Sequence, residues 1–294
     1  MFGGSIVAIV TPMKGGEVDE VSLRRLLAVH RDAGTNGIVP AGCTGEAATL
    51  TFDERMRILE ICLEEMGDET PVIPGTGSNS TRETIRLTSA ARRAGAHGVL
   101  IITPYYNKPT PEGQLRHYLA VADEVDVPIV VYNVPGRTGT DMLPETIARL
   151  AEHPNIVAIK EAGGSVDRVS AILELSDITV LSGDDPLTLP MMAVGASGVV
   201  SVVANVLPSL VREMVAAQSD DPSRALTLHR TLRPVSNALF LESNPGPVKH
   251  AMAELGMLDS GELRPPLTEV REATARAMAP VIENIRKLAA NEAP

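Results

Sequence analysis

Short runs rich in valine and isoleucine recur along the chain, and each is followed by a segment with helical periodicity. This alternation is typical of repeated βα units around a parallel sheet. The sequence predicts eight strands, at residues 5–12, 37–42, 71–75, 98–103, 128–133, 156–160, 178–182 and 198–203. Eight such units close most economically into a barrel, so the predicted fold class is α/β, a (β/α)8 TIM barrel.

The segments between the runs carry helix-start signals. Residues 51–54, Thr-Phe-Asp-Glu, form a capping-box pattern, and residues 80–83 repeat it, which makes Glu83 most simply a capping carboxylate. Pro111 suits the first position of a helix, and an apolar stripe follows it. The strands and their helices occupy about residues 1–218. Residues 219–294 are predicted to form a C-terminal helical appendage outside the barrel, broken at residues 244–247.

Charge and composition exclude several classes of protein. The net charge is −11 and no cluster of lysine and arginine occurs, which argues against nucleic-acid binding. No run approaches the ~20 apolar residues of a membrane span, and the first residues lack the pattern of a signal peptide. Cys43 and Cys62 show no pairing pattern, so a reducing cytoplasm is the expected location.

Lys160 ends the apolar run 156–160, in a chain with only five lysines. In (β/α)8 barrels, catalytic groups gather at the carboxyl ends of the strands. An amine buried there loses hydration and tends to lose its proton, and a neutral amine can attack a carbonyl. The sequence therefore predicts a Schiff-base enzyme. Taken alone, Lys160 would more often be a salt-bridged surface group.

Tyrosines gather at the same ends of the predicted strands. Three of the four tyrosines, Tyr105, Tyr106 and Tyr132, follow or end two strands, whereas core filling would scatter them. Imine formation needs a group that gives and takes protons, and a phenol can do both. Tyr132 lies on the strand next to that of Lys160 and is the best candidate. By itself it is as often a packing residue.

Two segments offer groups that suit carboxylates. Glycines flank Cys43 and Thr44, which provide main-chain N–H groups and a hydroxyl. Arg137 lies in a Pro/Gly loop and could hold a second carboxylate, although it could also pair with a loop acid. The pair at 184–185, Asp-Asp, is better suited to turn or cap duty than to catalysis.

Other catalytic classes have less support. The six histidines and two cysteines show no metal-ligand spacing, so no metal is predicted and a class II aldol mechanism is unsupported. The loops after the last two strands, where barrels often bind phosphate, are acidic rather than basic. A phosphorylated substrate is therefore disfavoured.

Nearly the whole chain resembles the dihydrodipicolinate synthase / N-acetylneuraminate lyase family. The resemblance runs from residue 2 to at least residue 249. The shared motifs are GxxGE at 42–46, TPYY at 103–106, YNVPxRTG at 132–139 and the segment IKEA around Lys160.

The resemblance, through TPYY and Arg137, favours the dihydrodipicolinate synthase branch, which condenses pyruvate with aspartate 4-semialdehyde on the route to diaminopimelate and lysine. It implies that Lys160 forms the imine with pyruvate, that Tyr132 relays protons, and that Thr44 with its backbone holds the pyruvate carboxylate. It also implies that Arg137 binds the semialdehyde carboxylate. Such enzymes need no cofactor.

Further expectations come from the resemblance alone. Gly183 and Val200 would complete the substrate site. Tyr106 would reach a neighbouring subunit's site, which implies a homotetramer built from two tight dimers. Cys43 stands where the family usually has a threonine that joins the relay, and a thiol is a longer, weaker hydrogen-bond group.

The family's feedback pocket for lysine is matched only in part. Asn79, Glu83 and Tyr105 occupy its positions, but Ala47, Phe52 and Arg55 replace polar or imidazole groups that are often found there. The sequence leaves lysine sensitivity open.

Two other functions remain alternatives. The closest is a sister class I aldolase or dehydratase acting on 2-keto-3-deoxy sugar acids, because Lys160 and Tyr132 serve imine chemistry generally. Arg137 distinguishes the two, since a side chain over the barrel mouth suits a second short acid. A non-catalytic barrel that senses pyruvate is the third possibility, and Cys43 in place of the usual threonine lends it some support.

Overall fold

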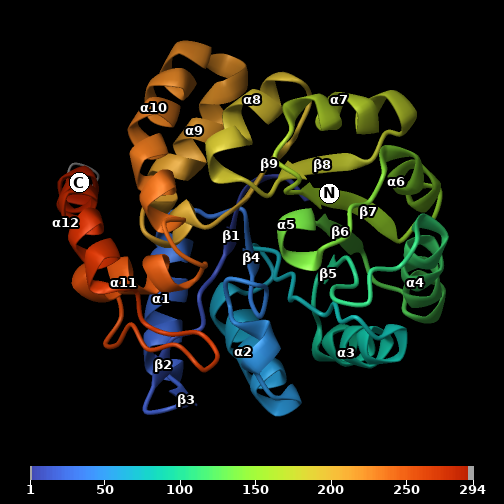
Figure 1. The fold of residues 1–294 in the computed structure, drawn as a ribbon, viewed down its shortest axis with the longest axis horizontal. Coiled ribbons are helices and arrows are strands. Elements are labelled where there is room, and N and C mark those ends of the chain that lie inside the picture. The colour runs from blue at the N-terminus through green and yellow to red at the C-terminus, as the bar shows by residue number, and fades with distance from the viewer. Residues whose placement is uncertain (1, 291–294) are drawn as a thin grey trace.

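A parallel sheet curves around the centre of the molecule and brings the strand ends together (Figure 1). The computed structural model describes residues 2–290. The sheet runs in the order β4-β1-β9-β8-β7-β6-β5. Its strands are β1 (Gly4–Ala8), β4 (Gly37–Val39), β5 (Val99–Ile102), β6 (Ile129–Asn133), β7 (Ile156–Glu161), β8 (Thr179–Ser182) and β9 (Gly198–Ser201). A small hairpin, β2 (Met13–Lys14) and β3 (Glu17–Val18), lies outside this sheet.

The predicted strand at 71–75 is wrong as a regular strand. The segment makes only isolated bridges, one to β4 and one to β5. Pro71 and Pro74 have no N–H to donate, so a continuous ladder cannot form. Their carbonyls still accept hydrogen bonds, from Ile38 N at 2.8 Å and from Leu100 N at 2.9 Å. The segment therefore fills the eighth position and closes the barrel, so the predicted (β/α)8 architecture is confirmed.

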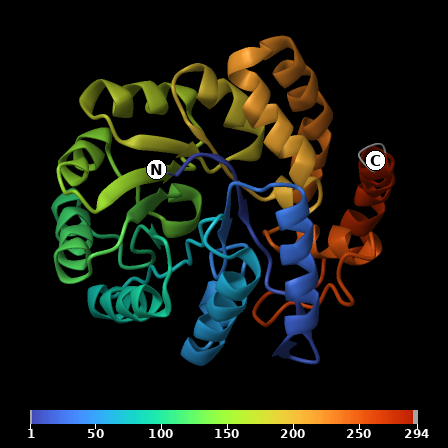
Figure 2. The same cartoon turned by 180° about the vertical axis from the view of Figure 1, so that it is seen from behind.

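Within residues 2–290, eight helices surround the barrel. Figure 2 shows this ring of helices from behind. They are α1 (Glu20–Asp32), α2 (Phe52–Met66), α3 (Thr81–Ala94), α4 (Pro111–Glu124), α6 (Pro144–Ala151), α7 (Val166–Leu175), α8 (Thr188–Ala193) and α9 (Pro208–Asp220). Four short helical turns lie in the loops: η1 (Ala47–Thr49), α5 (Pro135–Thr138), η2 (Asp185–Leu187) and η3 (Val203–Asn205).

The helix-start signals have mixed outcomes. Thr51 begins α2 with a full capping box, and Pro111 occupies the first turn of α4, as predicted. At α3 only half of the predicted box forms. The Ser80 side chain accepts from Glu83 N, but the Glu83 carboxylate pairs with Arg86 at 2.7 Å instead of returning to the cap. A nearby guanidinium is a stronger partner for a carboxylate than a main-chain N–H.

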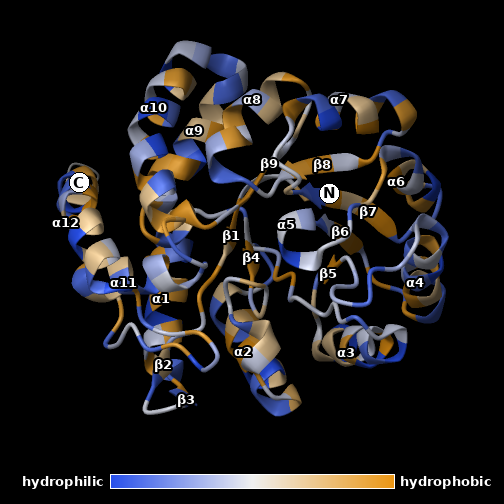
Figure 3. Ribbon diagram, in the orientation of Figure 1, coloured by the Kyte–Doolittle hydropathy of each residue, from blue (hydrophilic) through white to orange (hydrophobic). Residues whose placement is uncertain are grey.

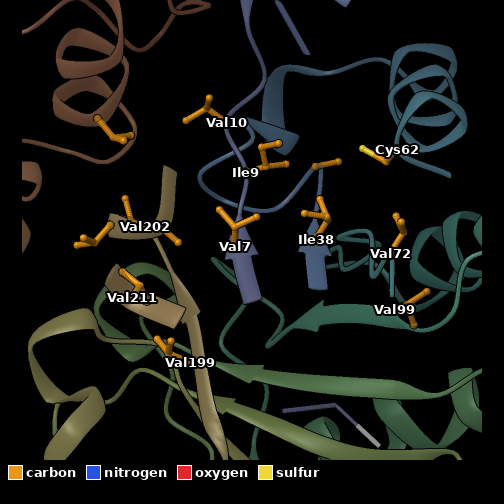
Figure 4. Close-up of a cluster of buried hydrophobic side chains, with 14 of the residues drawn as sticks. Val7, Ile9, Val10, Ile38, Cys62, Val72, Val99, Val199, Val202 and Val211 are labelled. Carbon is orange, nitrogen blue, oxygen red and sulfur yellow. The ribbon is translucent and has the colours of Figure 1, made fainter. Parts of the chain in front are cut away.

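The strands separate two apolar layers because successive side chains point to opposite faces. Ala158 on β7 and Val130 on β6 point into the barrel, whereas their neighbours Ile159 and Val131 belong to the layer between barrel and helices. Figure 3 shows the same division, with hydrophobic strands inside and hydrophilic outer helix faces. Figure 4 shows part of the outer layer, where Cys62 of α2 points toward the strands. The same alternation turns side chains at the strand ends into the barrel mouth.

Three further helices lie outside the ring: α10 (Pro222–Leu239), α11 (Gly246–Glu254) and α12 (Glu272–Ala290) (Figure 1). Helix α10 packs mainly against α9. The predicted boundary at residue 218 falls just before the end of α9, and the division 1–218 and 219–294 stays a prediction. Among the described residues, no helix is long and apolar enough to cross a bilayer.

Candidate active site

Lys160 and Tyr132 lie side by side inside the barrel mouth. They are register partners on the neighbouring strands β7 and β6. Because paired residues on parallel strands face the same side, both side chains point inward. Lys160 is only 5% exposed, and its Nζ lies over the Tyr132 ring, 4.3 Å from the centroid. The structure thus brings together the predicted nucleophile and the predicted proton relay.

Burial changes the ionisation of both groups. Loss of solvation lowers the pKa of Lys160 to about 8, although nearby Cys43 and Asp185 oppose the shift. The neutral fraction near neutral pH is therefore far larger than in an ordinary lysine. Burial raises the pKa of Tyr132 well above its usual value, with a further contribution from Cys43. The phenol keeps its proton at neutral pH and can donate it.

The predicted site residues Gly183 and Val200 both lie within the barrel. A Cβ at position 183 would lie 2.9 Å from Lys160 Cε, so the glycine leaves room for the lysine side chain. Val200 is buried in the same inner layer as Tyr132. The structure therefore shows room for Lys160 beside Gly183 and places Val200 in the inner layer of the barrel.

A polar network directly follows both residues and was missed by sequence reasoning. The buried Glu161 carboxylate accepts from Asn133 Nδ2 at 3.1 Å and from Arg168 Nε at 3.1 Å. Burial raises the pKa of Glu161, and the Arg168 charge opposes this. Since Asn133 follows Tyr132 and Glu161 follows Lys160, the network fixes both strand ends. The signal for this network in the sequence was the glutamate that directly follows Lys160 at the end of a buried strand.

The loop after β4 presents main-chain donors. The N–H groups of Cys43 and Thr44 donate to no acceptor within residues 2–290. The loop is compact, because a Cβ at Gly45 would lie 2.9 Å from Ala41 N. The Thr44 side chain is buried, and its Oγ1 accepts from Asn244 Nδ2 at 2.9 Å. The two N–H groups and the hydroxyl thus belong to the turn in which the sequence predicts a carboxylate site.

A cavity of about 370 Å³ opens beside this loop. Its lining includes Cys43, Tyr105, Tyr132, Arg137 and Asn244. Tyr132 lines the cavity and covers the Lys160 amine, which is not itself part of the lining. The Arg137 guanidinium donates to the Asn244 carbonyl at 3.2 Å, which holds it at the cavity. Its position suits a second carboxylate.

Two other predicted residues lie apart from this cavity. Tyr106 is 87% exposed and has a left-handed backbone conformation, with a φ of +73°. The polar turn at 184–185 acts structurally through Asp185, whose buried carboxylate accepts from Val202 N at 2.9 Å. This agrees with the expected turn or cap duty.

The candidate regulatory residues are only partly gathered. Tyr105 lines the cavity together with Ala47 and Arg55. Glu83 is engaged by Arg86, and the Asn79 carbonyl accepts from Asn107 Nδ2 at 2.8 Å. Burial lowers the pKa of Arg55, while the charge of Glu83 opposes the shift.

A buried ion pair joins the C-terminal segment to the barrel and was also missed. Lys249 Nζ lies 2.7 Å from Glu46 Oε1, and both side chains are 0% exposed. Arg264 N donates to the other Glu46 oxygen at 3.0 Å. Breaking such a pair by removing one partner costs about 3–5 kcal/mol. The signal lay in two motifs, GxxGE and the segment ending at Lys249, which sequence alone could not place together.

These features define a class of protein, a (β/α)8 barrel with a buried lysine and a tyrosine on adjacent strand ends. A sequence model described as the Dihydrodipicolinate synthetase family matches residues 1–285. The chain belongs to this family. It is 52% identical to a relative from Pelobacter propionicus named 4-hydroxy-tetrahydrodipicolinate synthase, over 97% of this chain and 99% of the relative.

Solved structures agree with this assignment. A dihydrodipicolinate synthase from Aquifex aeolicus is 44% identical, with a TM-score of 0.94 and coverage of 97% of this chain and 98% of that one. A second, from Acinetobacter baumannii, is also 44% identical, with a TM-score of 0.95 and coverage of 97% and 99%. That structure is described as chloride inhibited and complexed with pyruvate.

Proposed function

We propose that this protein condenses pyruvate with L-aspartate 4-semialdehyde to form 4-hydroxy-tetrahydrodipicolinate, in the biosynthesis of diaminopimelate and lysine. The protein is then a lyase that works through a Schiff base. The observation that carries the proposal is the full-length match to a relative with that name, at 52% identity. The buried Lys160 against Tyr132 supplies the chemistry that the name requires.

In the proposed mechanism the neutral Lys160 amine attacks the keto carbon of pyruvate. A C–N bond forms, the carbonyl oxygen takes up a proton, and the carbinolamine then loses water to give the imine. Tyr132 would give and take these protons, because its side chain lies against the amine and a phenol can both donate and accept a proton. Loss of a methyl proton from the imine then produces the carbon nucleophile that adds to the semialdehyde.

The two carboxylates would bind at separate groups. The free N–H groups of Cys43 and Thr44, with the Thr44 hydroxyl, would hold the carboxylate of pyruvate. Arg137 would hold the carboxylate of the semialdehyde, because its guanidinium borders the cavity. This position favours a second short acid over a polyhydroxylated sugar acid.

A coupled assay tests the choice of substrate. Purified protein with pyruvate is offered either aspartate semialdehyde or 2-keto-3-deoxygluconate, and product formation is measured. We expect turnover only with the semialdehyde. Turnover of the sugar acid alone would support the sister aldolase or dehydratase, and absence of any borohydride-trapped pyruvate adduct would support a non-catalytic binding protein.

The assembly is also part of the proposal. Tyr106 would reach the site of a neighbouring subunit and extend its relay, in a homotetramer of two tight dimers. Support comes from its 87% exposure, which leaves the phenol accessible to another subunit. The cytoplasmic location stays a prediction.

Replacing Cys43 by threonine should keep or raise the condensation rate. The thiol lies close enough to Tyr132 and Lys160 to affect the pKa of both. A hydroxyl makes shorter and stronger hydrogen bonds than a thiol, so proton transfer should improve. The measurement is kcat in the coupled assay. Cys62→Ser would not serve as a control, because Cys62 is buried in the outer core. A large fall in kcat would mean that the thiol has a task of its own.

L-Lysine should inhibit this protein weakly, although Asn79, Glu83 and Tyr105 match the expected regulatory pocket. The positive charge of Arg55 borders the same cavity, and Glu83 is already paired with Arg86. The ammonium groups of lysine would therefore meet repulsion from Arg55 and find Glu83 already engaged. The check is the initial rate at millimolar lysine, and strong inhibition that is lost in Tyr105→Phe would contradict the expectation.

A further inference from the structure

Asn244 touches both groups that the proposed function assigns to carboxylates. Its side-chain Nδ2 donates to Thr44 Oγ1 at 2.9 Å, and its main-chain carbonyl accepts from Arg137 at 3.2 Å. The two partners come from distant parts of the chain, 200 and 107 residues away from Asn244. Asn244 is buried and also lines the cavity. A residue of the C-terminal segment therefore belongs to the barrel mouth.

The position of Asn244 is fixed from both sides. Helix α11 begins at Gly246, and its Lys249 is held by the fully buried Glu46 of the same loop that carries Thr44. Because Glu46 and Thr44 lie in one tight turn, the ion pair and the Asn244 hydrogen bond fasten α11 to the same loop. The Asn244 amide is thus presented to Thr44 by a preorganised frame.

We propose that Asn244 is a positioning residue that sets the Thr44 hydroxyl as a hydrogen-bond donor to the carboxylate of pyruvate. This inference rests on the proposed function. A threonine hydroxyl has one proton to donate and can also accept. The Asn244 N–H occupies the oxygen as acceptor, so the Thr44 proton is free for an anion. Together with the N–H groups of Cys43 and Thr44, which donate to no acceptor among the described residues, the hydroxyl would offer the carboxylate a third donor.

The main-chain contact to Arg137 has a different consequence. It uses the carbonyl of Asn244, which any substitution at this position retains. Changes to the side chain should therefore weaken pyruvate binding and leave semialdehyde binding nearly unaltered. A merely structural role would disturb both substrates together, because both partners would move.

The test compares Asn244→Ala, Asn244→Asp and the control Asn237→Ala, which removes an exposed asparagine of α10. The measurements are the half-saturating pyruvate concentration for borohydride trapping, the KM of each substrate and the thermal midpoint. Asn244→Ala should raise the pyruvate values about threefold to tenfold, the effect of one hydrogen bond, while the KM for the semialdehyde stays within about twofold. Asn237→Ala should match the unaltered protein.

Asn244→Asp separates the two directions in which the hydrogen bond can run. An ionised carboxylate can only accept a hydrogen bond, so the Thr44 hydroxyl would donate to it instead of to pyruvate. The change would also place a negative charge near the pyruvate carboxylate. We expect a larger rise in the half-saturating pyruvate concentration than for Asn244→Ala. Unchanged pyruvate affinity in Asn244→Asp would overturn the inference, as would equal rises for both substrates in Asn244→Ala.

The same substitution made in a Thr44→Val protein separates the effect of the hydrogen bond from effects on folding. In Thr44→Val, which lacks the hydroxyl, a further Asn244→Ala change should add little to the pyruvate value, whereas independent effects would add in full and contradict the proposal. Trapping in the unaltered protein separates the two levels of the argument. Absence of an adduct in the unaltered protein would contradict the proposed function. Normal trapping whose half-saturating pyruvate concentration does not change on substitution of Asn244 would contradict only the role of Asn244.

Discussion

Replacing Lys160 by methionine should abolish the borohydride-trapped adduct with pyruvate and lower kcat by about a thousandfold or more. Methionine preserves much of the length and packing of the side chain but has no amine to attack the keto carbon. Intact mass after reduction and the coupled assay are the measurements. Lys287→Met, at an exposed position of α12, is the matched control and should trap pyruvate normally.

The pH dependence of trapping tests the same amine. Imine formation needs the neutral form, whose fraction rises with pH through the pKa, so the trapping rate should increase and level off above about 8. An ordinary exposed lysine would place this rise near 10.5. A midpoint near that higher value would show that the Lys160 amine is solvated, which contradicts its burial. An adduct that persists in Lys160→Met would assign the chemistry to another group.

Tyr132→Phe should lower kcat by about a hundredfold or more while pyruvate still traps slowly. The change removes only the hydroxyl and leaves the ring that contacts the Lys160 amine, so packing and burial persist. General acid–base groups typically contribute about 10²–10⁴-fold to rate, which sets the expected size. Single-turnover trapping and steady-state kcat are the two measurements.

The control for this change is Tyr118→Phe. Tyr118 is equally buried, on α4, and its hydroxyl donates to the Ile101 carbonyl at 2.9 Å. Its loss should cost about 1 kcal/mol of unfolding free energy, the net value of one hydrogen bond, with kcat nearly unchanged. If Tyr132→Phe behaved in the same way, another group would have to move the proton.

The sequence predicted the fold and the centre of the site for a shared reason. Strand and helix periodicity is local, and consecutive parallel strands lie next to each other, so the order of residues along the chain was enough to place Tyr132 beside Lys160. The prolines at 71 and 74 disrupted one strand without opening the barrel, because carbonyls can accept hydrogen bonds where N–H groups are missing. Periodicity does not reveal that distinction.

The contacts of the C-terminal segment were beyond prediction. The pairs Asn244–Thr44 and Lys249–Glu46 join residues about 200 positions apart in sequence, at points where neither periodicity nor strand order constrains the chain. The motifs containing these residues were visible, but a single sequence does not state which of them meet. This is why the appendage was expected only to lie outside the barrel.

That junction makes the geometry of the loop after β4 depend on residues of the C-terminal segment. A chain that ends after α9 contains Lys160, Tyr132 and the loop after β4, but it contains neither Asn244 nor Lys249. Glu46 then lacks the countercharge of Lys249, and Thr44 lacks the hydrogen bond from Asn244. A chain that stops there would carry Lys160 and Tyr132 without these two contacts, so the C-terminal quarter of the sequence holds the loop after β4 in place as well as packing outside the barrel.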